Sequence, residues 1–393
     1  MFIIPLEVLL LKIAQITFSF QPKYYRSNEY FISQEMAKLG HDVVVFCPDK
    51  EATWQISGKR SRSPVGVEEY DGFKVERINA GPEILNMPMM PKLLPTLLQK
   101  NFDVVHSHEC FSTCSFQGAI LSKAKKCPLV ITQHNDLLPL SFPHRFGYLL
   151  ANFTIGKFSF SEARKIIVLS NDIRHHLLGM GFNSDKIELI PTAVDTKLFS
   201  PYCDNLLESK WGISPPVILF VGRLVREKGV EYLIQAFQEV IKEIPDTKLV
   251  ILGRGPMESE LKILQKHLQI KNVFFIKRID KSLMPNIYVG CNVLVLPSFR
   301  EPFGNVVIEA MASGRPVIGS YVGGIKETIV HGETGYHIPP GNTKMLVDFL
   351  LTILSDDKLN AKLGKEARKR ALKIYDSELI AKKIERIYLN AIS

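Results

Sequence analysis

The segment from Glu301 to Glu309, EPFGNVVIE, combines two carboxylates with residues that favour a loop followed by a helix. Its proline and glycine are poor helix-interior residues, so we expect Glu301 on a loop and Asn305 at the start of a helix that carries Glu309. Free amides around Phe303, Gly304 and Asn305 can bind phosphate or sugar oxygens, and carboxylates accept hydrogen bonds from sugar or ribose hydroxyls. Both carboxylates are therefore expected to face one ligand-binding crevice.

Two cations follow another apolar run, in VILFVGRLVREKG, where Arg223 and Lys228 come just after a predicted buried strand. Because the carboxyl end of such a strand already presents a helix N-terminus, two cations there suit a diphosphate. Taken alone, the pair is equally compatible with a solvated loop. In VILGRGP, Gly253 and Gly255 form a glycine turn that allows close backbone approach to a base or phosphate, but it is not a full dinucleotide fingerprint.

Short runs rich in Val and Ile, each followed by helical spacing, predict parallel sheets covered by helices. The first set is KIAQITF, DVVVFC, DVVHSH, LVITQH and KIIVLS, and the second is VILFVGR, KLVILGRG, VFFIKR, NVLVLPS and PVIGS. Leu233, Phe237, Val240, Ile241 and Ile244 recur at three- and four-residue steps and predict the buried face of a helix in the second set. The sequence therefore predicts an α/β protein with two Rossmann-like, doubly wound domains.

The length of 393 residues also favours two domains. Prolines and polar residues interrupt the periodicity near Phe199, which predicts a first domain over 1–199 and a second over 200–375, with a C-terminal amphipathic helix over 376–393. The net charge of +9 favours an anionic ligand or surface. Six scattered cysteines indicate reduced thiols and a cytoplasmic location. The apolar start is interpreted as an extended first strand, and no apolar run is long enough to span a bilayer.

The second half resembles the donor-binding domain of the family 4 retaining glycosyltransferases, which have the GT-B fold. The hallmark of that family is Glu, seven residues, Glu, and here it is EPFGNVVIE, accompanied by GRLVREKG, GRGP and the paired glycines of VGGIKET. The resemblance covers nearly the whole chain and is most specific in the second half. It implies two Rossmann-like domains facing a central cleft, with the C-terminal helix packed back on the first domain.

The resemblance also implies roles for particular residues. Arg223 and Lys228 would hold the donor diphosphate, Glu309 the ribose, and Glu301 the transferred hexose. The remaining predicted donor-side positions are Gly222, Gly253, Gly255, Phe303, Gly304 and Asn305. Cations and amides would stabilise the leaving group, so we predict no metal and no cofactor. On the first domain, His134 resembles the family histidine near the donor sugar, and His108 is predicted to approach the acceptor.

The main departure from the family lies after the first strand, where many members carry paired glycines before a glutamate. Here Arg26 and Ser27 occupy those positions, and they cannot copy the backbone freedom of glycine. The loop is expected to offer Arg26 as a charged contact or to change the acceptor geometry. A zinc site formed by His106, His108, Cys110 and Cys114 is the disfavoured alternative, because the cysteines lack a paired CxxC spacing.

The leading hypothesis is a metal-independent hexosyltransferase that uses a UDP- or GDP-linked sugar and a glycan or lipid-linked hydroxyl acceptor, with retention of configuration. The alternatives on the same architecture are a nucleotide-sugar epimerase, a phosphorylase that uses pyridoxal phosphate, and a catalytically silent nucleotide-sugar-binding subunit. The segments 84–100 and 137–160 mix apolar residues with cations, which suits either a buried helix pair or peripheral association with the inner face of a membrane. The basic clusters lack interleaved aromatics, so no nucleic-acid partner is expected.

Overall fold

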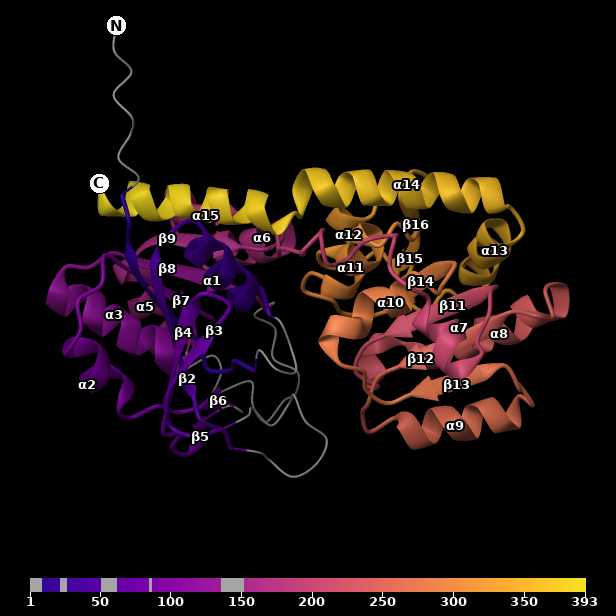
Figure 1. Cartoon of the computed structure of the whole chain (residues 1–393), viewed down its shortest axis with the longest axis horizontal. Coiled ribbons are helices and arrows are strands. Elements are labelled where there is room, and N and C mark those ends of the chain that lie inside the picture. The colour runs from indigo at the N-terminus through magenta and orange to yellow at the C-terminus, as the bar shows by residue number, and fades with distance from the viewer. Residues whose placement is uncertain (1–8, 22–26, 51–61, 85–86, 136–151) are drawn as a thin grey trace, which may run out of the picture. The chain divides into compact units, whose positions relative to one another are not determined.

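The computed structural model describes residues 9–21, 27–50, 62–84, 87–135 and 152–393 (Figure 1). The chain divides into two compact units. Unit 1 comprises Met1–Leu169, Ile173–Ile190 and Ala381–Ser393, and unit 2 comprises Ser170–Asp172 and Pro191–Ile380. The chain therefore leaves unit 1 close to residue 190, whereas the interruption of periodicity had suggested a boundary near Phe199. The last residues of the chain return to unit 1.

Unit 1 is built on an eight-stranded sheet in the order β10-β9-β8-β7-β1-β2-β4-β3, in which β3 is antiparallel to β4 and the other pairings are parallel. The strands are β1 (Lys12–Ile16), β2 (Asp42–Pro48), β3 (Gly66–Tyr70), β4 (Phe73–Ile78), β7 (Val104–His108), β8 (Leu129–Gln133), β9 (Ala163–Val168) and β10 (Ile187–Leu189), with a separate hairpin of β5 (Glu83–Ile84) and β6 (Met87–Pro88). The strand order reverses between β1 and β7. Ligands of open α/β sheets bind at such a switch point.

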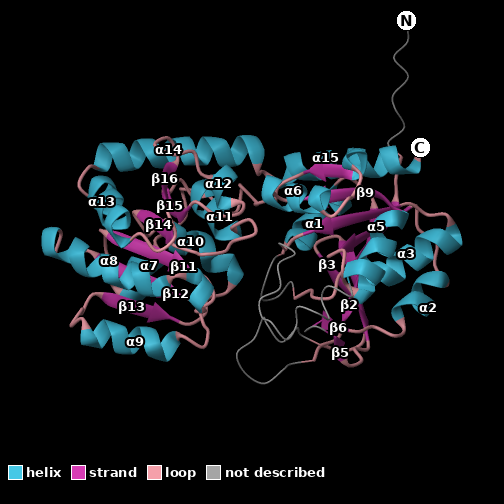
Figure 2. Cartoon of the chain, turned by 180° about the vertical axis from the view of Figure 1, so that it is seen from behind, coloured by secondary structure: helices cyan, strands magenta, loops and turns pink. Residues whose placement is uncertain are grey.

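The helices of unit 1 lie alongside its sheet (Figure 2). They are α1 (Asn28–Lys38), α2 (Leu93–Leu98), α3 (Thr113–Lys125), a π-helical turn (Asn152–Gly156), α5 (Lys157–Glu162), most of α6 (Asn171–Gly179), a 3-10 turn (Ser184–Lys186) and the end of α15 (Ser377–Ile392). Ser112 caps α3 by accepting a hydrogen bond from the Ser115 amide at 3.1 Å. A Cβ atom on Gly118 would lie 3.5 Å from Ile16 and Leu129, so α3 packs closely on the sheet at this glycine.

Unit 2 has a fully parallel six-stranded sheet in the order β13-β12-β11-β14-β15-β16. Its strands are β11 (Val217–Val221), β12 (Lys248–Leu252), β13 (Val273–Ile276), β14 (Val293–Leu296), β15 (Val317–Ser320) and β16 (Gly335–Ile338). Its helices are α7 (Leu206–Trp211), α8 (Val230–Glu243), α9 (Glu258–His267), α10 (Met284–Tyr288), α11 (Asn305–Ala312), α12 (Ile325–Thr328), α13 (Thr343–Leu354) and α14 (Asp357–Ile374), with 3-10 turns at Arg226–Lys228 and Lys281–Leu283. The order reverses between β11 and β14, so the loops after these two strands flank the switch point.

Burial on both faces explains why the strands of unit 2 read as continuous apolar runs. All residues of β11 and β14 are buried. Helix α8 covers the sheet with Leu233, Phe237 and Val240, each worth about 1.5–3 kcal/mol when fully buried. Ile241 and Ile244, predicted for the same face, are only partly buried. The buried face of α8 instead includes Ile234 and Ala236.

Three further differences from the sequence predictions concern unit 1. β1 begins at Lys12, and Leu9 and Leu10 are exposed, so the first strand is shorter than predicted. In the apolar segment 84–100, Leu93 and Leu97 of α2 are buried, which favours the interior alternative, and Leu98 is exposed. Residues 136–151 of the other apolar segment lie outside the described residues. Within the described residues, none of the helices is both long and apolar enough to cross a membrane.

Candidate active site

The loops after β11 and β12 in unit 2 meet backbone to backbone. A Cβ atom on Gly253 would lie 1.8 Å from the Gly222 carbonyl oxygen, and one on Gly255 would lie 2.2 Å from the Leu224 carbonyl oxygen. The Leu224 amide donates to the Arg254 carbonyl at 2.8 Å. These contacts leave no room for side chains, so the glycines are required to build one platform at the carboxyl ends of the two strands.

Lys228 and Glu301 form an ion pair across the switch point of unit 2. Lys228 ends the 3-10 turn after β11, and Glu301 follows β14. Both side chains are only 13% exposed. The approach is fixed by the backbone, because a Cβ atom on Gly229 would lie 2.2 Å from the Pro297 carbonyl oxygen. Arg223, the other predicted cation, is exposed, and no carboxylate of the described part of the chain forms an ion pair with it.

The loop that carries Glu301 is held by the paired glycines after β15. Gly323 has a φ of +46°, and a Cβ atom there would lie 1.8 Å from the Glu301 carbonyl oxygen. The Gly324 amide donates to that same carbonyl at 3.2 Å. Phe303 is buried and meets the Tyr375 ring edge-on, with the ring centroids 6.0 Å apart. The Phe303 side chain is therefore a core residue, and only its backbone is suited to a ligand.

Helix α11 begins at Asn305, as predicted, after Gly304 in the left-handed conformation with a φ of +92°. Its first amides are the hydrogen-bond donors that the sequence placed here. Glu309, one turn further on, is buried. Its carboxylate accepts a hydrogen bond of 2.7 Å from the Tyr288 hydroxyl and pairs with Lys281.

These two partners of Glu309 were not predicted from the sequence. Burial raises the pKa of Tyr288 well above its usual value, as does the nearby carboxylate, so the hydroxyl stays a donor. The Lys281 ammonium also lies over the Phe199 ring, 5.5 Å from its centroid. Glu309 is thus a fixed acceptor in unit 2, and its remaining lone pairs are oriented by these contacts.

A buried histidine network occupies the switch point of unit 1. His106 lies on β7 with its Nδ1 atom 2.6 Å from the Tyr388 hydroxyl and its Nε2 atom 2.7 Å from the Thr132 hydroxyl. The Gln15 amide donates to Tyr388 at 3.1 Å, so the Tyr388 hydroxyl donates its own proton to His106. The partners therefore assign the His106 proton to Nε2. Burial, followed by the effect of His134, lowers the pKa of His106 to about 3, which keeps the ring neutral.

His108 and His134 extend this network toward solvent. His108 Nε2 lies 2.7 Å from the Gln15 side-chain oxygen, which can only accept, so this nitrogen carries the proton. His108 Nδ1 then accepts from His134 Nε2, 2.9 Å away. Glu29 on α1 places its Oε1 atom 3.7 Å from His134 Nε2 and 3.9 Å from His108 Nδ1. Burial is the first cause that lowers the pKa of both histidines.

A second buried carboxyl group, Glu109, follows His108 directly. Its oxygens accept from Gln133 Nε2 at 2.8 Å and from Asn135 Nδ2 at 2.5 Å. Burial and the charge of Glu29 raise its pKa to about 8. Neither Glu29 nor Glu109 was singled out from the sequence, because a single glutamate on a helix or after a strand is usually a surface residue.

The predicted residues of unit 1 are only partly brought together. His108 and His134 are in direct contact. Ser27 is the N-cap residue of α1, and its hydroxyl has no hydrogen-bond partner in the described part of the chain. Arg26 lies outside the described residues. Cys110 and Cys114 are buried, and the described residues whose ligand atoms gather with those of His108 are Glu29 and His134, not these cysteines.

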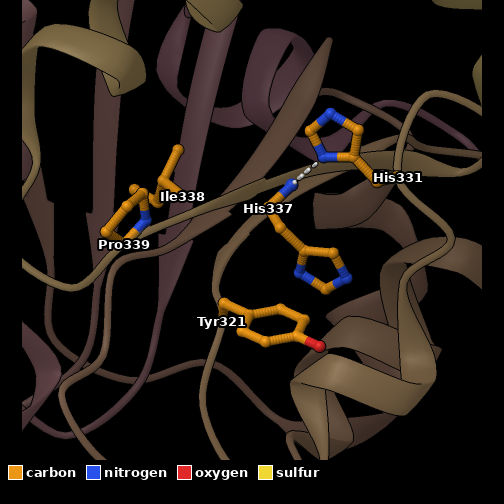
Figure 3. A pocket seen from close by; sticks show the side chains of 5 residues that line it. All are labelled: Tyr321, His331, His337, Ile338 and Pro339. Carbon is orange, nitrogen blue, oxygen red and sulfur yellow. Dashed lines mark hydrogen bonds between the residues drawn. The ribbon is translucent and has the colours of Figure 1, made fainter.

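A separate hollow of about 390 Å³ lies in unit 2 beside the ends of β15 and β16 (Figure 3). It is lined by Tyr321, His331, His337, Ile338 and Pro339. The His337 amide donates to His331 Nδ1 at 3.0 Å, and His337 Nε2 contacts the Ile329 carbonyl at 3.1 Å. None of its lining residues belongs to the predicted donor site, and none is a carboxylate.

Comparison with known proteins assigns the chain to a family. A family model described as "Glycosyltransferase Family 4" matches residues 30–198, and one described as "Glycosyl transferases group 1" matches residues 207–370. The chain is a family 4 glycosyltransferase. This glycosyltransferase is 28% identical to an uncharacterized glycosyltransferase of Methanocaldococcus jannaschii. The match covers 96% of this chain and 98% of the relative.

Solved structures show that the glycosyltransferase has the GT-B fold. Sucrose-phosphate synthase from Thermosynechococcus elongatus superimposes with a TM-score of 0.77 at 24% sequence identity. The match covers 97% of this chain and 100% of the synthase chain. The Anabaena protein HepE, solved in complex with UDP and glucose, gives a TM-score of 0.77 at 20% identity, covering 96% of this chain and 99% of HepE. These structures confirm the predicted fold class, and the family models confirm the prediction of an enzyme.

Proposed function

We propose that this glycosyltransferase transfers a hexose from a UDP- or GDP-linked donor to a glycan or lipid-linked hydroxyl, with retention of configuration and without a divalent metal. The observation that carries the proposal is the Lys228–Glu301 pair beside the start of α11. At one switch point, the cation and the helix amides suit the diphosphate of a sugar nucleotide, and the carboxylate suits the hydroxyls of its sugar. The complex of HepE with UDP and glucose supports a nucleotide-linked donor on this fold.

Arg223 and Lys228 would neutralise the diphosphate. Arg223 is exposed and able to reorganise, whereas Lys228 is held by Glu301. As the bond from the sugar to phosphate breaks, negative charge grows on the departing oxygen, and preorganised donors stabilise that charge more than they stabilise the ground state. The amides of Gly304 and Asn305 would add hydrogen bonds to the same group. This arrangement would stabilise the leaving group in the way that a bound metal ion otherwise can.

Glu301 and Glu309 would orient the sugar and the ribose. Glu309 is fixed by Tyr288 and Lys281 but retains acceptor capacity for ribose hydroxyls, because an ionised carboxylate offers about four lone-pair sites. Glu301 would bind hydroxyls of the transferred hexose. Its ion pair with Lys228 fixes the position of its side chain, which suits a positioning group, and no covalent sugar intermediate on the protein is required.

Unit 1 would supply the acceptor side of the reaction. His134 donates from Nε2 to His108, so its Nδ1 atom is the acceptor of the ring and suits a sugar hydroxyl. His108 would act through His134, since it is fully buried, while Ser27 and Arg26 would contact the acceptor. The acceptor hydroxyl would attack on the face from which the phosphate departs, and that phosphate would take its proton.

Transfer assays with each nucleotide sugar and a panel of glycan and lipid-linked acceptors test this function. Turnover that leaves the donor's anomeric configuration unchanged in the product is expected. Interconversion of nucleotide sugars without an acceptor would instead show an epimerase. Nucleotide-sugar binding with no turnover for any acceptor would show the silent subunit that Arg26 and Ser27 suggested, and a pyridoxal phosphate absorbance would show a phosphorylase.

A further inference from the structure

Three potential metal ligands converge at the switch point of unit 1. They are Oε1 of Glu29 on α1, Nδ1 of His108 on β7 and Nε2 of His134 just after β8. The two nitrogens are 2.9 Å apart, and the carboxylate oxygen lies 3.7 and 3.9 Å from them. Side chains from three separate elements therefore direct polar atoms at one small space.

The size of this triangle selects a type of ion. A point about 2.1 Å from all three atoms exists, which is the length of a zinc–nitrogen or zinc–oxygen bond. Ligands at that length are about 3.4 Å apart in a tetrahedral site and about 3.0 Å apart in an octahedral one. Two of the three edges exceed 3.4 Å. The separations thus fit a tetrahedral ion better than an octahedral one.

We propose that Glu29, His108 and His134 form a Zn²⁺ site with an open fourth position. Two histidines and one carboxylate are a known zinc ligand set, and three protein ligands leave room for water. The His134 side chain is 17% exposed, whereas that of His108 is fully buried, so the ion would enter past His134.

The surroundings of His108 favour this role. Metal-binding histidines usually donate their second ring proton to a fixed acceptor, which orients the ring. His108 does so through Nε2 to Gln15, and Gln15 is itself anchored by Tyr388. The tautomer assigned by this contact leaves a lone pair on His108 Nδ1, which lies 2.9 Å from His134 Nε2 and 3.9 Å from Glu29 Oε1. The hydrogen-bond acceptor that orients the His108 ring is therefore already in place.

The charge of the site also suits a cation. The hydrogen bonds of His108 assign it a neutral tautomer in which Nε2 donates and Nδ1 accepts. Glu29 forms no ion pair with a lysine or arginine of the described residues. Its buried neighbour Glu109 is hydrogen-bonded to amides, not to a cation. A divalent ion would neutralise a carboxylate that is 9% exposed and lacks a cationic partner in this part of the chain.

Zinc at this site would inhibit the proposed transfer, and this consequence rests on the proposed function. Binding forms a bond from His134 Nε2 to the ion, so the proton leaves Nε2 and the ring becomes the Nδ1–H tautomer with no net loss of a proton. His134 Nδ1 would then be a donor and could no longer accept from a sugar hydroxyl. Zinc is thus an inhibitor of the enzyme and not its cofactor.

Calorimetric titration of the full chain with ZnCl₂ alone, without nucleotide sugar, tests the site independently of transfer. One ion per chain is expected, with affinity at least about tenfold weaker in Glu29→Gln. Glu109→Gln is the matched control, since it changes the neighbouring buried carboxyl and should bind zinc like the wild type. The melting temperature of each metal-free variant verifies folding, and His134→Gln replaces Glu29→Gln if the latter fails to fold.

Cobalt identifies the ligands directly. Co²⁺ in the site should give the visible bands of a tetrahedral ion and no thiolate charge-transfer band, and Cys203→Ser, which removes the partly exposed thiol, should leave the spectrum unchanged. No zinc binding, equal loss in Glu29→Gln and Glu109→Gln, or a thiolate band would overturn the site. Stoichiometric binding that leaves transfer by the active enzyme unaffected would overturn its inhibitory role while leaving the proposed function intact.

Discussion

Lys228→Met is the substitution that tests the donor site most sharply. Lys228 and Glu301 are each only 13% exposed, so a charge about 4 Å from the lysine interacts with it at an effective dielectric constant of about 20, worth about 4 kcal/mol. The substitution removes this attraction for the diphosphate and leaves Glu301 to repel it. Allowing for partial replacement by water, we expect a loss of about 3 kcal/mol, or about 150-fold in nucleotide affinity and in kcat/KM.

Calorimetry with UDP and GDP measures the effect in Lys228→Met, Glu301→Gln and the double variant. Because the repulsion disappears with the carboxylate, the double variant should bind nucleotide about tenfold more tightly than Lys228→Met alone. Lys242→Met on α8 removes an exposed lysine that pairs with Glu239, and it should bind like the wild type. Unchanged affinity in Lys228→Met, or weaker binding in the double variant, would refute the reasoning.

Three further outcomes are expected. Gly323→Ala should lower the free energy of unfolding in urea by more than about 2 kcal/mol, because its Cβ atom would lie 1.8 Å from a carbonyl oxygen. The control Gly332→Ala, whose Cβ atom would have nothing within 4 Å, should lower it by about 1 kcal/mol. Equal losses in the two variants would contradict the backbone contact. Tyr388→Phe should lose about 1–3 kcal/mol in the same assay, since it leaves His106 Nδ1 and a Gln15 donor without their partner, and an unchanged unfolding curve would argue against the network. Transfer should persist in excess EDTA, and its abolition would disprove metal independence.

The features that were predicted correctly depend on local sequence. Strands buried on both faces require continuous Val and Ile runs, which identified β1, β2, β7, β8 and β9 and the strands from β11 to β15. The proline and glycine after Glu301 predicted the loop and the start of α11 at Asn305. Local rules of this kind do not depend on which elements become neighbours.

The features that were missed depend on neighbours distant in the chain. β3 is largely exposed and carries two glutamates, and β16 contains a histidine, so neither has the apolar pattern of an interior strand. Tyr388 meets His106 across 282 positions, and no periodicity relates them. The partners of Glu309 were missed for the same reason. In each unit, only the folded sheet brings these partners together at its switch point.

The anomeric configuration of the transfer product, followed by NMR from the first turnovers with a UDP- or GDP-linked hexose, tests the central proposal most directly. In the proposed reaction, the leaving group is held by Arg223, Lys228 and the amides of α11, and the acceptor attacks on the same face of the sugar. The product should therefore have the anomeric configuration of the donor. An inverted anomer would contradict the account.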